Sequence, residues 1–125
     1  MLRTQVVLAA LWGLMAVAAG AFGAHAAPDP QAKAWLQTGA HYQLTHALAV
    51  FACLAVQRAY AGAPAAGVAA WLFLAGGLVF AGSLYLMAAT GARALGAVTP
   101  IGGLLLLAGW ATLAWAAFTG SRSAG

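Results

Sequence analysis

Acidic residues are almost absent from this chain of 125 residues, in which Asp29 is the only carboxylate side chain. Charged residues of both signs make up 5% of the sequence, whereas soluble domains carry about 25%. So few charges do not suffice to cover the surface of a soluble protein of this size. The shortage of acid also excludes a pair of carboxylates for acid–base catalysis and an acid embedded in an apolar segment for proton-coupled transport.

Cysteine is equally scarce, because Cys53 is the only one in the chain. A single cysteine cannot form an intrachain disulfide, and it does not supply the set of thiolates that structural zinc sites use. The residue falls inside an apolar stretch, so we expect it to be buried as a small hydrophobic side chain.

Positive charge is modest and dispersed. The net charge is +4, and the basic residues are Arg3, Lys33, Arg58, Arg93 and Arg122. A nucleic-acid-binding protein gathers its lysines and arginines in a patch or stripe. We therefore expect no nucleic-acid partner, and the scattered basic residues suit the orientation of a membrane protein instead.

Apolar residues are abundant: they make up 65% of the chain, and the mean hydropathy is +0.93. They fall into four stretches, each close to the roughly 20 residues that a helix needs to cross a hydrocarbon core about 30 Å thick. We therefore predict an all-α membrane protein, a four-transmembrane-helix bundle that forms a single domain over residues 1–125. The predicted spans cover about residues 4–26, 40–60, 67–89 and 99–118.

The first stretch also has features of a secretory signal, since Arg3 precedes it and Ala24-His25-Ala26 follows with the small residues of a cleavage site. Signal sequences contain an apolar run of about 7–15 residues. The run here, Val6–Ala24, has 19 uninterrupted apolar or small residues. We therefore expect a first helix that is retained.

Residues 27–39 connect the first two spans and have a helix pattern of their own. Asp29 suits the position that caps a helix, Pro30 suits its first turn, and Gly39 suits its end. Trp35 lies beside polar residues, as in helices at the headgroup level of a membrane. We predict a short interfacial connector helix between helices one and two; the alternative is an ordinary surface loop.

Small residues are spaced along the predicted spans in a way that favours close helix packing. Ala16, Gly20 and Ala24 recur every four residues, which places a small-residue strip on one face of the first helix. Thr99 as a cap and Pro100 in the first turn predict the start of the fourth helix. The two glycines that follow favour close packing or, alternatively, an anion at the bare helix end. The candidate packing residues are Gly20, Gly23, Gly82, Gly102 and Gly103.

Polar residues converge at one end of the predicted bundle, because successive helices run in opposite directions. They end the first and third spans, begin the second and fourth, and lie in the loop between the third and fourth. The candidate cluster consists of His25, Tyr42, Gln43, His46, Ser83, Tyr85, Arg93 and Thr99. We expect His46 about one turn inside the membrane boundary, with Tyr42 and Gln43 one turn before it.

The cluster has three interpretations. It can be a polar cap that hydrogen-bonds helix ends and headgroups, a pocket for a small ligand or lipid headgroup, or a metal or haem site. Polar groups at membrane depth are costly unless they are partnered, which favours the cap. Three histidines without acids or suitable cysteines match no metal or haem motif, so we expect no cofactor. No nucleophile–base arrangement is recognisable, and we expect no catalytic residue.

Four segments resemble the YgdD-like family of small membrane proteins, also called domain-of-unknown-function family 423. They are Gly20–Ala26, Tyr42–Leu48, Phe80–Leu86 and Thr99–Gly103 with Gly109-Trp110. The resemblance covers nearly the whole chain and implies a four-helix protein of the bacterial inner membrane with a retained first span. It implies no activity. The chain departs from the family pattern at Ala81, where the family often has serine, and in its connector rich in proline and alanine.

These observations lead us to expect a small integral inner-membrane protein that is a non-catalytic structural or accessory component. The alternatives are an oligomeric conduit for small molecules or ions and a haem- or metal-binding membrane protein. The expected partners are the lipid bilayer and either further copies of the chain or another membrane protein.

We predict that both termini lie in the cytoplasm. Four spans place three basic residues on the side of the termini and two on the opposite side, and basic residues favour the cytoplasmic side. Fusions of a periplasm-active phosphatase to either terminus should therefore be inactive, whereas the same enzyme inserted after Pro28 should be active. Active terminal fusions would contradict the orientation, and an intact mass that begins at Ala27 would contradict the retained helix.

Overall fold

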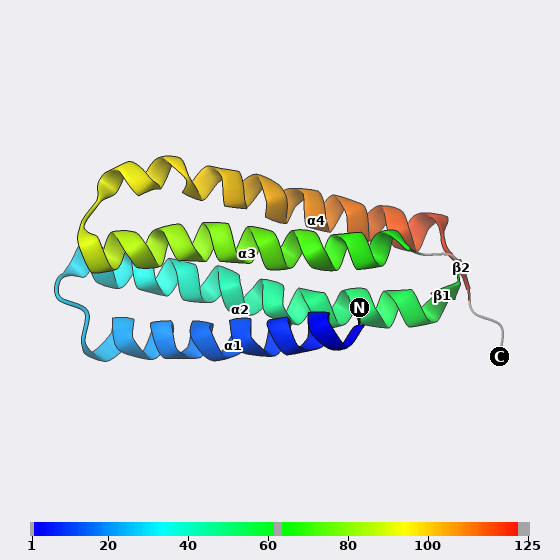
Figure 1. Cartoon of the computed structure of the whole chain (residues 1–125), viewed down its shortest axis with the longest axis horizontal. Coiled ribbons are helices and arrows are strands. Elements are labelled where there is room, and N and C mark those ends of the chain that lie inside the picture. The colour runs from blue at the N-terminus through cyan, green and yellow to red at the C-terminus, as the bar shows by residue number, and fades with distance from the viewer. Residues whose placement is uncertain (1, 62–63, 123–125) are drawn as a thin grey trace.

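The structure is a computed structural model of the chain that describes residues 2–61 and 64–122. Within these residues, four long helices run alternately in opposite directions and lie side by side (Figure 1). They are α1 (Leu2–His25), α2 (Pro30–Ala59), α3 (Ala65–Thr90) and α4 (Thr99–Thr119), with a short 3-10 helix, η1 (Arg93–Ala97), before α4. All four long helices have the length and the apolar composition to cross a membrane. The prediction of an all-α protein with four transmembrane helices is confirmed.

Two very short strands join the ends of α2 and α4. Residues Tyr60–Ala61 form β1, residues Ser121–Arg122 form β2, and the two pair antiparallel. The pairing ties the segment after α4 to the segment after α2 at one end of the bundle (Figure 1).

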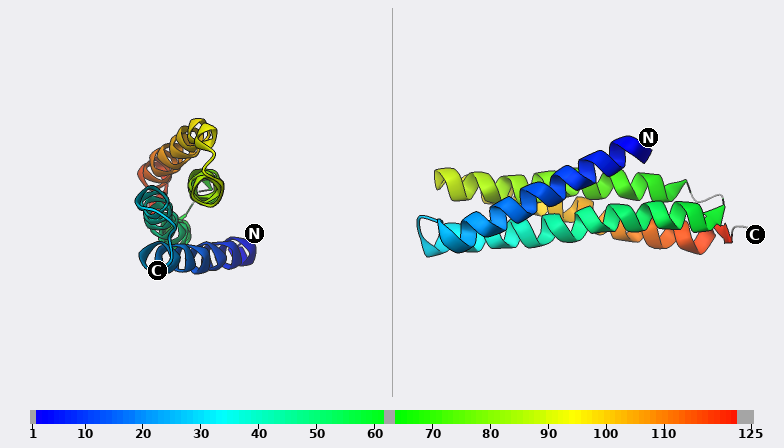
Figure 2. Two further views of the ribbon diagram at one scale, coloured as in Figure 1. Left: turned by 90° about the vertical axis from the view of Figure 1, so that its left-hand side faces the viewer. Right: turned by 90° about the horizontal axis from the view of Figure 1, so that it is seen from below.

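The helices α2 and α3 form the centre of the bundle, with α1 packed mainly on α2 and α4 mainly on α3. Figure 2 shows that α1 crosses α2 obliquely, so that its N-terminal half leans toward α3. The core is built from small and medium side chains around Val50, Phe73 and the fully buried Cys53. The predicted burial of this cysteine is confirmed.

Two side chains of α1 fasten it to the backbone of α3. The Gln5 side-chain amide donates to the carbonyl of Gly67 at 3.2 Å, and the Trp12 indole N–H donates to the carbonyl of Leu74 at 3.0 Å. Both donors and both acceptors are seven residues apart, a spacing that keeps them on one face where parallel helices wind around each other. Lipid gives apolar helices no hydrophobic reason to associate, so hydrogen bonds and close packing hold them together.

The helix α2 is longer than the predicted span. Asp29 caps it by accepting a hydrogen bond from the Ala32 backbone N–H at 2.8 Å, and Pro30 lies in its first turn, as expected. The helix then continues through Gly39, so the residues of the predicted connector helix form the first turns of α2 and no separate helix ends there. Gly39 serves packing instead, because a Cβ atom at this position would lie 2.7 Å from Cε1 of Tyr85.

The start of α4 also differs from the prediction. Pro100 lies in its first turn, but Val98 occupies the cap position and Thr99 is already helical. The Thr99 hydroxyl lies 2.5 Å from the Ser83 hydroxyl of α3 instead of capping its own helix. A hydroxyl at the interface of two helices is stabilised by such a partner, because hydrocarbon offers it none.

Glycine residues, which have no side chain, let α4 approach α3 closely. An added Cβ at Gly102 would lie 2.7 Å from the Cα of Phe80, and one at Gly103 would contact the Phe80 ring at an ordinary 3.9 Å. Gly109, which is not among the candidate packing residues, is equally close: an added Cβ would lie 2.6 Å from the ring of Phe73. The packing of α4 on α3 therefore requires glycine at two positions about two turns apart.

The remaining candidate packing glycines lie in α1 and α3. A Cβ atom added at Gly20 would lie 3.6 Å from the Cβ of Ala40 on α2, and one added at Gly23 would lie 3.1 Å from the Cβ of Leu36 on α2. In contrast, nothing lies within 4 Å of an added Cβ at Gly82, so this glycine makes no close approach. Small residues occur on every side of these helices, and spacing alone does not show which of them face a neighbour.

We predict opposite effects of one substitution at Gly102 and at Gly82. Gly102→Ala should lower the free energy of unfolding by about 1–3 kcal/mol, because the new methyl group overlaps the Phe80 backbone. Gly82→Ala should be neutral or stabilise the protein by up to about 1 kcal/mol, since alanine favours the helix and the space is open. Denaturant unfolding in a mild detergent measures both variants, and equal effects at the two positions would contradict the packing described here.

Candidate functional site

The predicted polar cluster divides into separate groups in the structure. His25 at the end of α1 and Arg93 at the start of η1 are exposed, and no hydrogen bond or ion pair joins the side chain of either to another described residue. Five of the other six members have side chains that make hydrogen bonds between helices, whereas Tyr42 contributes only its backbone carbonyl, which bonds to His46 in the same helix. The candidate site is therefore a set of local pairings at different depths and not one convergent cluster.

His46 lies near the middle of α2, because this helix begins at Pro30 and not near residue 40. Its Nδ1 is 2.6 Å from the carbonyl oxygen of Tyr42, and its Nε2 is 3.0 Å from the indole nitrogen of Trp110 on α4. A carbonyl can only accept and an indole N–H can only donate. The imidazole must therefore carry its hydrogen on Nδ1 and accept at Nε2, which makes it neutral and joins α2 to α4.

Aromatic rings surround the His46 side chain. The ring of Phe73 on α3 lies 5.5 Å from the imidazole and 4.8 Å from the ring of Trp110. The ring of Tyr42 is nearly parallel to the imidazole at 6.1 Å. His46 is only 6% exposed, so its two hydrogen bonds lie in apolar surroundings, where leaving either group unpaired is costly.

A second pairing joins α2 to α3 and α1. Gln43 is 1% exposed, and its side-chain oxygen accepts a hydrogen bond of 2.7 Å from the Tyr85 hydroxyl. Its side-chain nitrogen lies 3.7 Å from the sulfur of Met15 on α1, which is a weak acceptor. The structure thus brings together the predicted residues Gln43 and Tyr85 and gives both a partner inside the bundle.

A third pairing joins α3 to α4. The hydroxyls of Ser83 and Thr99 lie 2.5 Å apart, and the Ser83 hydroxyl is also 2.8 Å from the carbonyl of Phe80. Ser83 is buried, and it lies beside the close approach of Gly102 to Phe80. An anion has no room next to Gly102, because the α3 backbone already occupies that space.

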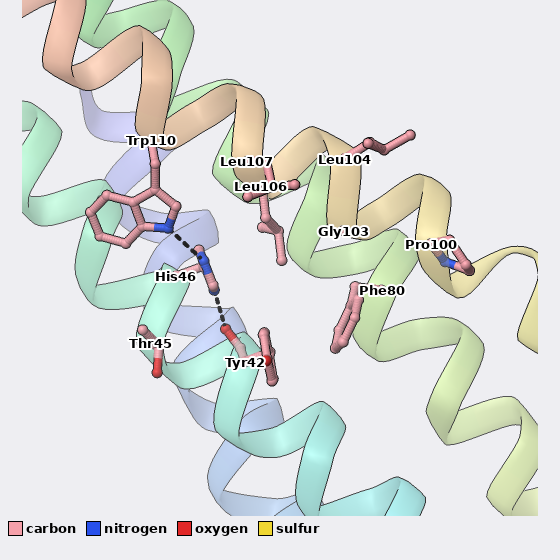
Figure 3. A pocket seen from close by; sticks show the side chains of 10 residues that line it. All are labelled: Tyr42, Thr45, His46, Phe80, Pro100, Gly103, Leu104, Leu106, Leu107 and Trp110. Atoms are coloured by element: carbon pink, nitrogen blue, oxygen red, sulfur yellow. Dashed lines mark hydrogen bonds between the residues drawn. The ribbon is translucent and has the colours of Figure 1, made fainter.

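An open groove lies on the side of the bundle between α2 and α4. Its volume is 590 Å³, and Figure 3 shows Tyr42, Thr45 and His46 on the α2 side, with Phe80 of α3 between the two walls. The wall formed by α4 consists of Pro100, Gly103, Leu104, Leu106, Leu107 and Trp110. The lining is therefore mostly apolar, and the groove opens toward the surroundings of the bundle, which in this protein are lipid.

The arrangement leaves little scope for acid–base or metal chemistry. Both ring nitrogens of His46 are engaged in hydrogen bonds, so neither offers a lone pair to a metal without breaking a pairing. His25 and His41 are exposed, and no hydrogen bond joins either side chain to His46. Among the residues that the structure describes, no three His, Cys, Asp or Glu side chains gather in one place.

The candidate cluster and the candidate packing residues leave out Trp110 and Phe80, which both line the groove, although both lie in segments that carry the family resemblance. A signal for Trp110 was present, because an indole N–H in the middle of an apolar span needs an acceptor. His46 is the residue of α2 that provides one. The signal for Phe80 is limited to its place in the segment Phe80–Leu86, because the residue type itself is unremarkable in any transmembrane helix.

We predict that Gln43 and Tyr85 are energetically coupled. Gln43→Leu leaves the Tyr85 hydroxyl without an acceptor, and Tyr85→Phe leaves the Gln43 oxygen without a donor, so each should cost about 1–3 kcal/mol. The double variant should lose less than the sum, by about 0.6 kcal/mol, the average for hydrogen bonds between transmembrane helices, and by no more than about 1.7 kcal/mol. Unfolding in a mild detergent measures the cycle, and strictly additive losses would show that the pair does not interact.

Comparison with known proteins identifies the relatives of the chain. Residues 19–103 match the family model described as a protein of unknown function, DUF423. The UPF0382 membrane protein YwdK of Bacillus subtilis is 36% identical over 120 residues, which cover 93% of this chain and 97% of the relative. No solved structure gives a significant match.

Two further relatives agree with this assignment. A UPF0382 membrane protein of Staphylococcus haemolyticus is 40% identical over 118 residues, which cover 90% of this chain and 93% of the relative. The UPF0382 inner membrane protein YgdD of Escherichia coli is 38% identical over 121 residues, which cover 89% of this chain and 86% of the relative. The chain therefore belongs to the DUF423 family, whose members carry the name UPF0382 membrane proteins.

Proposed function

We infer that the protein is a non-catalytic accessory component of the inner membrane, which acts by holding a partner against its helices. The observation that supports this most is the pairing of the buried polar groups in the candidate cluster. The side chains of Gln43, His46 and Ser83 each bond to a neighbouring helix. A general acid, general base or nucleophile must instead present a free proton or lone pair to a substrate.

The groove between α2 and α4 fits a binding function. Sites for small ligands are mostly apolar clefts of about 300–1,000 Å³ with a few polar groups. The groove has a volume of 590 Å³ and combines leucine and aromatic side chains with the polar groups of Tyr42 and Thr45. It opens on the side of the bundle, where membrane components have direct access to it.

The E. coli relative is named an inner membrane protein. We assign the same membrane to this chain, and the distribution of its basic residues supports termini in the cytoplasm. In this orientation the end of the bundle that carries His25, Arg93 and the start of α4 lies on the outer side.

Native mass spectrometry of the protein extracted in a mild detergent tests the proposed function. We expect a lipid or membrane-protein partner bound at fixed stoichiometry. His46→Gln should keep this partner, since glutamine can also donate and accept hydrogen bonds while it lacks an imidazole.

Two results would contradict a non-catalytic accessory role. Substrate-dependent flux from liposomes that contain only this protein would show a conduit. A haem absorption band or a stoichiometric metal in the wild type, lost in a folded His46→Gln variant, would show a cofactor site. Liposomes with Gln43→Leu/Tyr85→Phe protein provide the control for leakage caused by a weakened bundle.

A further inference from the structure

The groove between α2 and α4 spans one half of a membrane. Along α4 it extends from Pro100 in the first turn to Trp110 near the middle of the helix. At 1.5 Å per residue, this segment is about 15 Å long, which is half of a hydrocarbon core about 30 Å thick. The groove therefore matches one leaflet in length, and the His46–Trp110 hydrogen bond closes it near the middle of the membrane.

The polar groups of the groove are arranged unequally along its length. The His46 imidazole at the deep end is fully paired, and the Thr45 hydroxyl donates to the carbonyl of His41 in its own helix. The Tyr42 hydroxyl, by contrast, has no hydrogen-bond partner among the described residues, and the residue is 42% exposed. One free donor is thus left beside apolar walls.

The free hydroxyl lies near the outer end of the groove. The Tyr42 ring packs on the Phe80 ring at 4.6 Å, and the Phe80 backbone lies against Gly102 in the first turn of α4. The level of Tyr42 is therefore about one turn, or roughly 5 Å, inside the start of α4. At this depth the acyl chains of a membrane lipid join its ester groups, and an ester carbonyl can accept a hydrogen bond but not donate one.

We propose that the groove binds one acyl chain of a membrane glycerophospholipid from the leaflet on the side where α2 begins. The Tyr42 hydroxyl donates to the ester carbonyl at the outer end, the chain lies along Leu104 and Leu107, and its methyl end reaches Trp110. This inference rests on the proposed function, because it names the partner that the accessory protein holds. A transmembrane helix of another protein suits the groove less well, because its backbone carbonyls are already paired and leave the tyrosine without an acceptor.

Photolabelling of the wild-type chain provides the first test. The protein is placed in vesicles of phosphatidylethanolamine and phosphatidylglycerol that contain phosphatidylglycerol with a diazirine in one acyl chain. Leu104 and Leu107 are each 66% exposed, and Leu14 on α1 is 67% exposed, so passing lipids should label all three equally. A bound chain should label the two groove leucines several-fold more than Leu14, and equal labelling would overturn the proposal.

Lipid retention in native mass spectrometry provides the second test. Gly103→Leu places a side chain in the groove and should abolish the retained phospholipid. Gly13→Leu adds the same bulk on α1, where an added Cβ would have no neighbour within 4 Å, and this variant should retain the phospholipid.

A pair of tyrosine variants tests the hydrogen bond to the lipid. Tyr42→Phe should weaken phospholipid retention about two- to tenfold, the value of one hydrogen bond, while Tyr60→Phe outside the groove should not weaken it. Equal retention in Gly103→Leu and Gly13→Leu, or in the two tyrosine variants, would overturn the assigned contacts.

The failure of this inference and the failure of the proposed function give different results. Equal photolabelling together with a stoichiometric protein partner, or a dimer that Gly103→Leu dissociates, would overturn the lipid site and leave an accessory role in place. Flux through liposomes or a bound cofactor would overturn the accessory role whatever the labelling pattern.

Discussion

The need to pair every polar group without water is the constraint on which this structure depends. Hydrocarbon offers hydrogen-bonding groups no partners, and it gives apolar helices no hydrophobic reason to associate. For the buried side chains, the described part of the chain meets both conditions with the same contacts. Polar side chains join α1 to α3, α2 to α3, α3 to α4 and α2 to α4, so each pairing also fixes a helix in the bundle.

The groove is a consequence of how tightly α4 packs on α3. Gly102 and Gly109 bring α4 against the backbone and ring of α3, where any side chain would separate the helices. Held in this position, α4 contacts α2 only sparsely, and His46 and Trp110 bridge the two helices at depth. The space on the outer side of this bridge stays open, with Tyr42 at its edge. Packing between two helices thus creates a binding surface between one of them and a third.

Sequence patterns located the helices well and their ends less well. The cap at Asp29 follows from local chemistry, because its carboxylate lies three residues before the N–H that it accepts from. The local pattern suits Gly39 equally well to end a helix and Thr99 to cap one. In the structure, however, Gly39 packs against Tyr85 of α3, and the Thr99 hydroxyl pairs with Ser83 of α3. A residue with two available roles takes the one that its distant neighbours stabilise more, and those neighbours are not visible in a local pattern.

The sequence by itself determined the membrane-protein class, the four transmembrane helices and the family, because these depend on composition, length and ordered motifs. It also placed most polar residues toward one end of the bundle, since alternating helices require this. Only the tertiary structure decided that Tyr85 pairs with Gln43 and Trp110 with His46, and that Gly109 packs closely while Gly82 does not. The physical reason is that a contact depends on the rotation and crossing of two helices, and small residues on all sides of a helix leave that rotation undetermined.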